Sequence, residues 1–328
     1  MNTSPHRPTD PHENTSPHRP TDPHENTSPH RPTVPHENTS AHRPTDLHVD
    51  PSALALAGRG RVYDLSSGWW PGMPLAPGHP PFQVLTFRTP AGERAQGARG
   101  ELEWMRDNAS RFGFISEILS FCAHSGTHID ALAHITSGEN DEWYGGYSAH
   151  EYLGDYGPLT HDASTLPPLL CRAVLVDAPG ALGRETLRPH QPIDPDLIEL
   201  ALKRQQVRIE EGDVVLLRTG TMKHWPDTGA MAAVQGAGLD LEGARMLARH
   251  RPAAVGSDTA AVEVSPSGVQ GEPQPVHRLL IRDLGVPLME WVYLEELAAA
   301  RVHEFLLLCL PLPITGATGS PVRPVAIA

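Results

Sequence analysis

The chain has 328 residues, enough for one large domain or two modest ones with a sizeable core. Its net charge of −13 and its lack of a Lys/Arg cluster argue against a nucleic-acid-binding protein. The sequence has no apolar run long enough to span a bilayer and no secretory signal pattern, and its three cysteines without paired spacing favour a reducing compartment. We therefore expect a cytoplasmic protein that acts on a small molecule and binds neither nucleic acid nor membrane.

A twelve-residue repeat fills the first part of the chain. The unit Asn2–Glu13 recurs from Asn14 and Asn26 and, degraded, from Asn38. Frequent proline and very few apolar residues disfavour helix and cannot form a core. We predict a disordered, partly polyproline tail over residues 1–52. Its histidines could bind stray metal, but a repeat without a specific function is the simpler interpretation.

The remaining residues, 53–328, are predicted to form one domain that opens with a strand and an aromatic loop. Val62–Ser66 is typical of a short strand, and the Gly- and Pro-containing run 67–74 predicts a loop. Two adjacent tryptophans in this loop, Trp69 and Trp70, could wall an apolar pocket for an aromatic or cyclic substrate, or they could simply pack.

Another strand is predicted over residues 115–123, directly before a cluster of histidines. We expect Phe121 and Cys122 at its end to lie in the core. Phe121 is also a candidate for lining the substrate pocket.

Three histidines and one aspartate follow within eleven residues, in the run His124-Ser-Gly-Thr-His128-Ile-Asp130-Ala-Leu-Ala-His134. In an extended chain these four positions share one face because their offsets are even, whereas in a helix Asp130 would turn away. Gly126 lets the backbone turn close to an ion. Imidazole nitrogens with one carboxylate suit Zn, Mn, Fe or Co and leave room for water. The pattern predicts a catalytic metal site, and a buried strand of unrelated polar residues is disfavoured because unpaired buried His and Asp are costly.

Strands and helices alternate in the rest of the chain. The predicted strands fall within residues 172–177, 213–218, 253–263 and 305–310, and the predicted helices cover residues 194–203 and 241–249. Apolar runs bounded by turns are typical of strands inside a covered sheet, and Asp194 before Pro195 is typical of a helix start. Asp258 could orient either a ligand or the backbone. The alternation predicts an α/β fold.

The pattern His-x-Gly-Thr-His-x-Asp, with a further His four residues later, resembles the signature of the metal-dependent cyclase family, whose members include bacterial kynurenine formamidase and isatin hydrolase. The similarity extends over about residues 60–328 and includes Tyr63–Ser66, Gly212–Gly220 and Gly316–Pro324. The resemblance implies a single domain with a mixed β-sheet or barrel-like β-core flanked by helices, of the swivelling β/β/α type. Leu132 departs from the formamidase pattern, which often has Pro there.

The resemblance also implies roles for the motif. His124, His128 and Asp130 would ligate the metal, and His134 would be the catalytic acid and base. The alternative for His134 is a further ligand.

A second ion is implied by the segment around His277 and Glu290, which in the formamidases joins the shared aspartate, here Asp130. The two residues are one position further apart than in the formamidases. The alternative is that His277 caps a short helix and Glu290 lies on a solvated turn. We expect one divalent ion, Zn or Mn, and regard two as the alternative.

Together these features predict a metal-dependent hydrolase that cleaves a C–N amide bond in an arylformamide, a lactam or another cyclic amide. The first alternative is a cyclase or dehydratase of secondary metabolism, in which the ion acts as a Lewis acid. The second is a non-catalytic relative that only binds a small molecule or a metal. By resemblance we also expect a homodimer or homotetramer.

Overall fold

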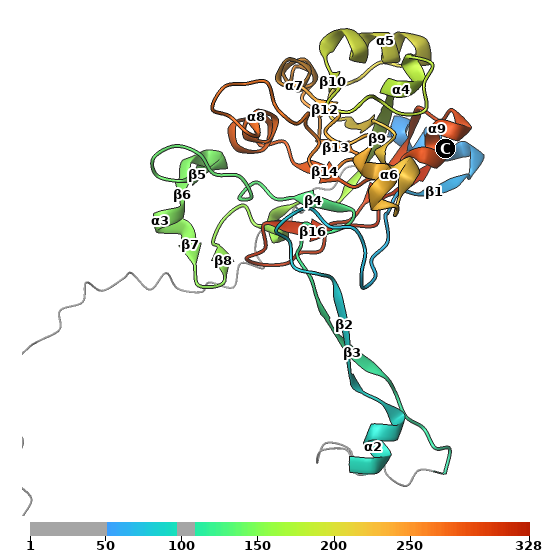
Figure 1. Ribbon diagram of the computed structural model, residues 1–328, viewed down its shortest axis with the longest axis vertical. Helices are drawn as coiled ribbons and strands as arrows, with labels where there is room; N and C mark the ends of the chain where they lie inside the picture. Colours follow the sequence, from blue (N-terminus) through green and yellow to red (C-terminus); the bar gives the residue numbers. More distant parts are fainter. Residues whose placement is uncertain (1–50, 97–108) are drawn as a thin grey trace, which may run out of the picture. The chain divides into compact units, whose positions relative to one another are not determined.

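A nine-stranded sheet forms the centre of the structure, a computed structural model that describes residues 51–96 and 109–328 (Figure 1). In order across the sheet, the strands are β1 (Val62–Asp64), β17 (Val325–Ile327), β15 (Glu304–Cys309), β9 (Leu169–Asp177), β11 (Val214–Arg218), β13 (Ala254–Ser257), β14 (Leu288–Glu290), β4 (His128–Asp130) and β16 (Gly319–Pro321). The four strands from β9 to β14 run parallel, and the other neighbours pair antiparallel. The predicted α/β fold with a mixed sheet in one domain is confirmed, while the repeat tail lies outside the described residues.

Alternate side chains of the central strands pack on opposite faces of the sheet. Val174 and Val176 of β9 belong to one apolar cluster, and Ala173 and Leu175 belong to another. All four are fully buried, and β11 repeats the alternation. Strands covered on both faces need apolar residues at every position, which explains the unbroken hydrophobic runs in the sequence.

Two longer helices cover one face of the sheet, α5 (Pro195–Gln205) and α7 (Leu241–Ala248), as Figure 1 shows. The carboxylate of Asp194 accepts a hydrogen bond from the backbone N–H of Leu197 at 2.8 Å and so caps α5. Asp240 caps α7 in the same way. Both helices are confirmed where the sequence predicts them, because a side-chain acceptor satisfies the free N–H groups of the first turn.

The other helices are short: α1 (Pro51–Leu56), α2 (Pro90–Gln96), α3 (Ala149–Tyr152), α4 (Ala178–Ala181), α6 (Thr228–Ala232), α8 (Pro275–His277), which continues as a π-helical turn (Arg278–Asp283), and α9 (Glu295–Ala300). Four two-stranded ribbons lie outside the nine-stranded sheet: β2 (Gln83–Arg88) with β3 (Ser116–Ser120), β5 (Glu142–Trp143) with β6 (Tyr147–Ser148), β7 (Leu153–Gly154) with β8 (Gly157–Pro158), and β10 (Pro192–Ile193) with β12 (Gly238–Leu239). In the described ranges, the helices are all too short or too polar to cross a bilayer.

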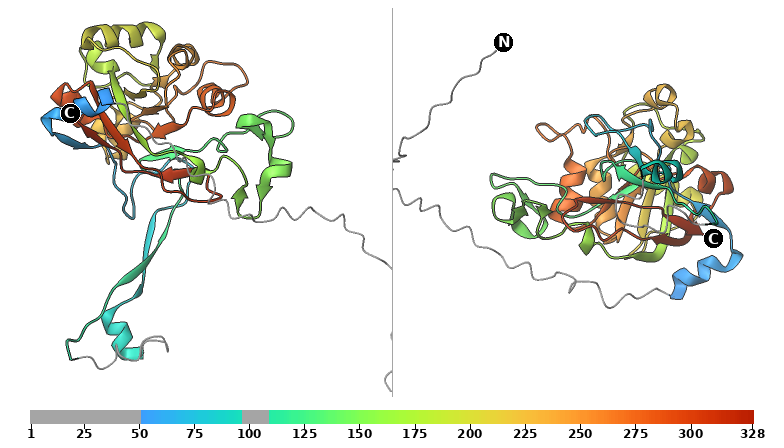
Figure 2. Two further views of the ribbon diagram at one scale, coloured as in Figure 1. Left: turned by 180° about the vertical axis from the view of Figure 1, so that it is seen from behind. Right: turned by 90° about the horizontal axis from the view of Figure 1, so that it is seen from below.

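The β2–β3 hairpin extends away from the nine-stranded sheet (Figures 1 and 2). Its strands carry exposed apolar side chains, among them the directly paired Leu85 and Ile118, which are 50% and 53% exposed. A two-stranded hairpin has no core of its own. The described part of the chain therefore leaves the apolar residues of this hairpin uncovered.

The strand predicted over residues 115–123 is confirmed as β3, but the expectation that Phe121 and Cys122 lie in the core is wrong. Both are only partly buried. The chain leaves the hairpin here, and the ring of Phe121 packs against Phe82, tilted by 34°, at 5.3 Å between centroids. Since β3 pairs with β2 rather than with the main sheet, its end does not reach the core.

Asp258 orients the backbone. It is fully buried directly after β13, and its two oxygens accept hydrogen bonds from the backbone N–H groups of Thr219 and Gly220, both at 2.8 Å. Burial raises the pKa of Asp258 to about 6. This aspartate holds the turn that follows β11.

Candidate metal centre

The register between strands β4 and β14 positions the central residues of the candidate metal site. β4 lies between β14 and β16, and His128 is paired with Glu290. Residues 128 and 130 point to the same face, while Ile129 between them packs in the core. One strand pair thus joins an imidazole and a carboxylate that are far apart in the sequence.

The prediction that the whole motif is one extended strand is wrong, because only His128–Asp130 is strand. Turns on either side carry His124 and His134. Gly126 makes the first turn possible: its φ is +61°, and a Cβ there would lie 2.8 Å from the indole nitrogen of Trp69. Strand alternation therefore places His128 and Asp130 on one face, whereas turns position His124 and His134.

His124 is held from both sides. Its Nδ1 lies 2.8 Å from Oδ1 of Asp130, and its Nε2 lies 3.0 Å from the hydroxyl of Thr318. Thr318 belongs to the Gly316–Pro324 segment, and sequence reasoning gave it no role. The ring of His124 is thereby fixed beside the Asp130 carboxylate.

His128 has its free lone pair on Nε2. Its Nδ1 donates to the carbonyl oxygen of Gly126 at 2.8 Å, which fixes the tautomer. Nε2 of His128 and Oδ2 of Asp130 are both buried, and neither has a hydrogen-bond partner among the residues that the structure describes. Nε2 lies 3.5 Å from Oδ1 of Asp130 and 3.4 Å from Oε2 of Glu290. Acceptor atoms left unpaired inside a protein are costly, so this spot suits a cation.

The charges around His128 support the same conclusion. Burial opposes a charged imidazole, but the negative charges of the nearby Asp130 and Glu290 carboxylates outweigh it and raise the pKa of His128. A proton or a metal ion at Nε2 would therefore be stabilised by these two carboxylates. Three N/O donors around one point are what Zn²⁺ or Mn²⁺ needs, so the residues fit a divalent ion.

A second group of donors overlaps the first. Among the described residues, the ligand atoms of His124, His128 and Asp130 lie within 4.8 Å of one another, and so do those of Asp130, His277 and Glu290. Nε2 of His277 is 3.1 Å from Oε1 of Glu290. The alternative of a solvated Glu290 is wrong, because this residue is 6% exposed and lies in β14. Two ions sharing Asp130 are geometrically compatible with this chain.

His134 lies against the first group without joining it. Its ring stacks on His124 with centroids 4.0 Å apart, and within the described ranges it belongs to neither donor group. Burial, aided by the neighbouring His124 and opposed by Asp130, lowers the pKa of His134 to about 4. A neutral imidazole in this position can accept a proton.

A further histidine, His79, lies at the same place. Its ring centroid is 6.4 Å from that of His124. Burial, with the nearby charges of His124 and His128, lowers the pKa of His79. Sequence reasoning missed this residue because it stands alone in a Pro- and Gly-containing loop, with no local pattern to mark it.

Aromatic side chains surround the motif turn. The indole N–H of Trp69 donates to the carbonyl oxygen of Ser125 at 2.8 Å. Trp70 contacts Trp225 edge-on at 5.6 Å, and Trp225 lies 5.3 Å from Trp291, which directly follows Glu290. Trp225 and Trp291 were not anticipated. That Trp69, Trp70 and Phe121 line a substrate pocket stays a prediction.

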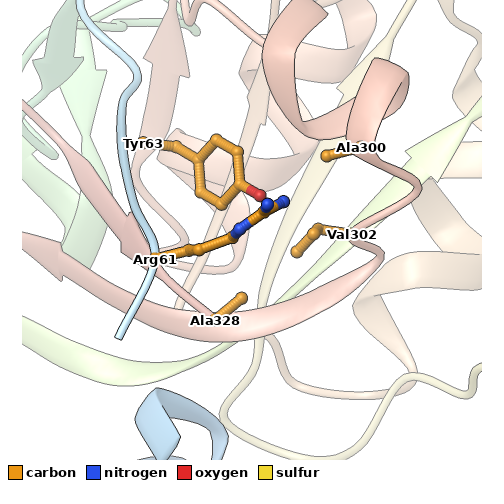
Figure 3. Close-up of a pocket in the computed structure, with 5 residues that line it drawn as sticks. All are labelled: Arg61, Tyr63, Ala300, Val302 and Ala328. Atoms are coloured by element: carbon orange, nitrogen blue, oxygen red, sulfur yellow. The ribbon is translucent and has the colours of Figure 1, made fainter. Parts of the chain in front are cut away.

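A separate pocket lies at the other edge of the sheet (Figure 3). It is lined by Arg61, Tyr63, Ala300, Val302 and Ala328. Tyr63 belongs to β1, which is at the opposite end of the strand order from β4 and β16. This pocket is therefore distinct from the metal centre.

A family model for the Cyclase family matches residues 63–264, more than half of the chain. The chain belongs to the Cyclase family. The match includes the histidine motif and the loop with Trp69 and Trp70, and it confirms the family indicated by the sequence motifs. No curated protein matches the chain.

Solved structures agree with this placement in the Cyclase family. A structure described as a novel cyclase is 27% identical, with a TM-score of 0.72, and the match covers 84% of this chain and 90% of that chain. Isatin hydrolase A from Ralstonia solanacearum is 21% identical, with a TM-score of 0.60, over 86% of this chain and 98% of that one. Isatin hydrolase A from Labrenzia aggregata is 21% identical, with a TM-score of 0.57, and the match covers 84% of this chain and 97% of that chain. The two hydrolases share the fold of this Cyclase-family chain.

Proposed function

We propose that this protein is a metal-dependent hydrolase that opens a C–N amide bond in an arylformamide, a lactam or another cyclic amide. The observation that carries the proposal is a pair of buried atoms, Nε2 of His128 and Oδ2 of Asp130, that have no hydrogen-bond partner in the described part of the chain and lie among N and O donors. Such a donor set suits a divalent ion of the Zn or Mn type. When bound, that ion would polarise a carbonyl group and lower the pKa of a water molecule towards about 7.

The chain's own residues supply the proton transfers. His134 stacks on His124, next to the donor groups, where its imidazole can take a proton from the attacking water. A C–O bond forms while the C–N bond breaks, and the proton that leaves the water ends on the departing nitrogen. One residue can perform both transfers in turn, first as base and then as acid.

The aromatic residues favour a substrate with a flat ring. Trp70, Trp225 and Trp291 form a continuous contact chain beside the motif. Stacking on tryptophan stabilises aromatic rings. Isatin, which appears in the names of three of the structural neighbours, is a cyclic amide fused to an arene and is the first substrate to test.

The test is a hydrolysis screen of the purified full-length chain with isatin, N-formylkynurenine and simple lactams, combined with elemental analysis. We expect bound Zn or Mn and hydrolysis of at least one amide. Removal of the metal should lower the rate at least about 1,000-fold, since a metal ion supplies several kcal/mol and about 1.4 kcal/mol corresponds to a factor of ten. Adding Zn or Mn back should restore it. Hydrolysis that survives metal removal would contradict the proposal, and metal-loaded protein that hydrolyses none of these amides would favour ring-forming chemistry.

We also propose that the protein is a homo-oligomer in which a second copy covers the β2–β3 hairpin. The support is the exposed apolar pair Leu85 and Ile118 and the closed symmetry usual among soluble enzymes. Light scattering should give the mass of a dimer or tetramer. Leu85→Glu should shift it to a smaller species, while Gln83→Glu, which adds the same charge on the same strand, should not. A monomeric wild-type protein would contradict this proposal.

A further inference from the structure

Glu263 is a buried carboxylate next to the second donor group. It lies in the segment after β13, is 4% exposed, and is held by a backbone bridge to Leu239. Within the described part of the chain, its one ion pair is with His277. A buried carboxylate needs several hydrogen bonds to remain charged, so the contacts of Glu263 indicate what it does.

The side-chain contacts of Glu263 converge on the start of helix α8. Oε1 of Glu263 lies 2.5 Å from Nδ1 of His277 and accepts from the backbone N–H of the same residue at 3.1 Å. Oε2 accepts from the backbone N–H of Val276 at 3.2 Å. The two backbone bonds fix the carboxylate, and the carboxylate in turn fixes the imidazole ring.

The orientation of the ring has a chemical consequence. A carboxylate facing Nδ1 keeps a hydrogen on Nδ1, so Nε2 is the nitrogen that gives up its hydrogen when an ion binds. Nε2 is the atom that points to Glu290, at 3.1 Å, and it belongs to the donor group that includes Asp130. A histidine whose second nitrogen is held by a carboxylate is a better oriented and more basic metal ligand.

We propose that Glu263 is a positioning residue that prepares His277 to bind the second divalent ion together with Asp130 and Glu290. The proposal rests on the proposed function only in requiring a metal at this centre. The role of Glu263 goes beyond the proposed function because it divides the centre into two metal sites whose histidines are oriented by different groups. His128 is oriented by the backbone carbonyl of Gly126, whereas His277 is oriented by a charged side chain.

The experiment is a calorimetric titration of the metal-free full-length protein with Zn²⁺ and, separately, Mn²⁺. Wild type should bind two ions. Glu263→Gln should bind the first ion as wild type does and the second about 10- to 100-fold more weakly, because a neutral amide orients the ring less strictly and makes it less basic. The matched control is Glu272→Gln, which breaks the 2.7 Å ion pair of Glu272 with Arg278 at the same helix and should leave both affinities unchanged.

The outcomes separate positioning from a structural role. If Glu263 only caps α8, Glu263→Gln will lower the unfolding temperature of the metal-free protein but leave the second affinity unchanged, which would overturn the proposal. Equal weakening of both ions, or a single ion in wild type, would also overturn it. Should Glu263→Gln fail to fold, Glu263→Asp keeps the charge at a shorter reach and should weaken the second ion alone. No substrate is involved, so a failed hydrolysis screen leaves this result intact.

Discussion

Replacing Asp130 with alanine is expected to remove both ions and to lower kcat/KM at least about 1,000-fold, because a metal ion supplies several kcal/mol of transition-state stabilisation. Asp130 is the residue that the two donor groups share. Its Oδ1 lies 2.8 Å from Nδ1 of His124, and its buried Oδ2 has no hydrogen-bond partner within residues 51–96 and 109–328. Without this carboxylate, neither group has three donors.

The measurement is elemental analysis of Asp130→Ala together with kcat/KM on the substrate found in the screen. Asp196→Ala is the matched control, because Asp196 is exposed in the first turn of α5 and lies outside both donor groups. Circular dichroism should give the same spectrum for all three proteins. An Asp130→Ala protein that keeps two ions would show that the donor groups do not share this residue.

The elements of the fold were predictable where local chemistry decides the structure. The apolar runs of β9 and β11 are buried on both faces, and the carboxylate of Asp194 caps α5 as the sequence suggests. The hairpin strand β3 was predictable as a strand but not in its surroundings. An apolar strand pattern reports the backbone conformation, and it does not report whether the same chain covers the strand.

The candidate site was predictable only in its local part. The motif His124–His134 identifies the donors, and resemblance supplies His277 and Glu290. The positions of Glu263, Thr318 and Trp291 relative to that motif depend on strand register and loop packing between segments distant in the sequence. No periodicity within one segment encodes such contacts. The sequence also did not indicate the turn at Gly126. This turn brings His124 to Asp130, which a single extended strand would not do.

Replacing His134 with alanine should leave both ions in place and lower kcat by about 100- to 10,000-fold, the usual contribution of a general acid or base. His134 stacks on His124 but belongs to neither donor group of the described chain. His134→Asn is a second variant that fills most of the space beside His124 and cannot transfer the proton. His150→Ala is the matched control, because His150 is exposed on α3.

The decisive measurement for His134 is whether its replacement changes kcat or KM. Proton transfer stabilises the transition state and not the bound substrate, so kcat and kcat/KM should fall together while KM stays near its wild-type value. Loss of an ion from both variants would instead make His134 a ligand. Full activity in both would mean that the proton acceptor is another group, and His79, at 6.4 Å from the ring of His124, would be the next residue to replace.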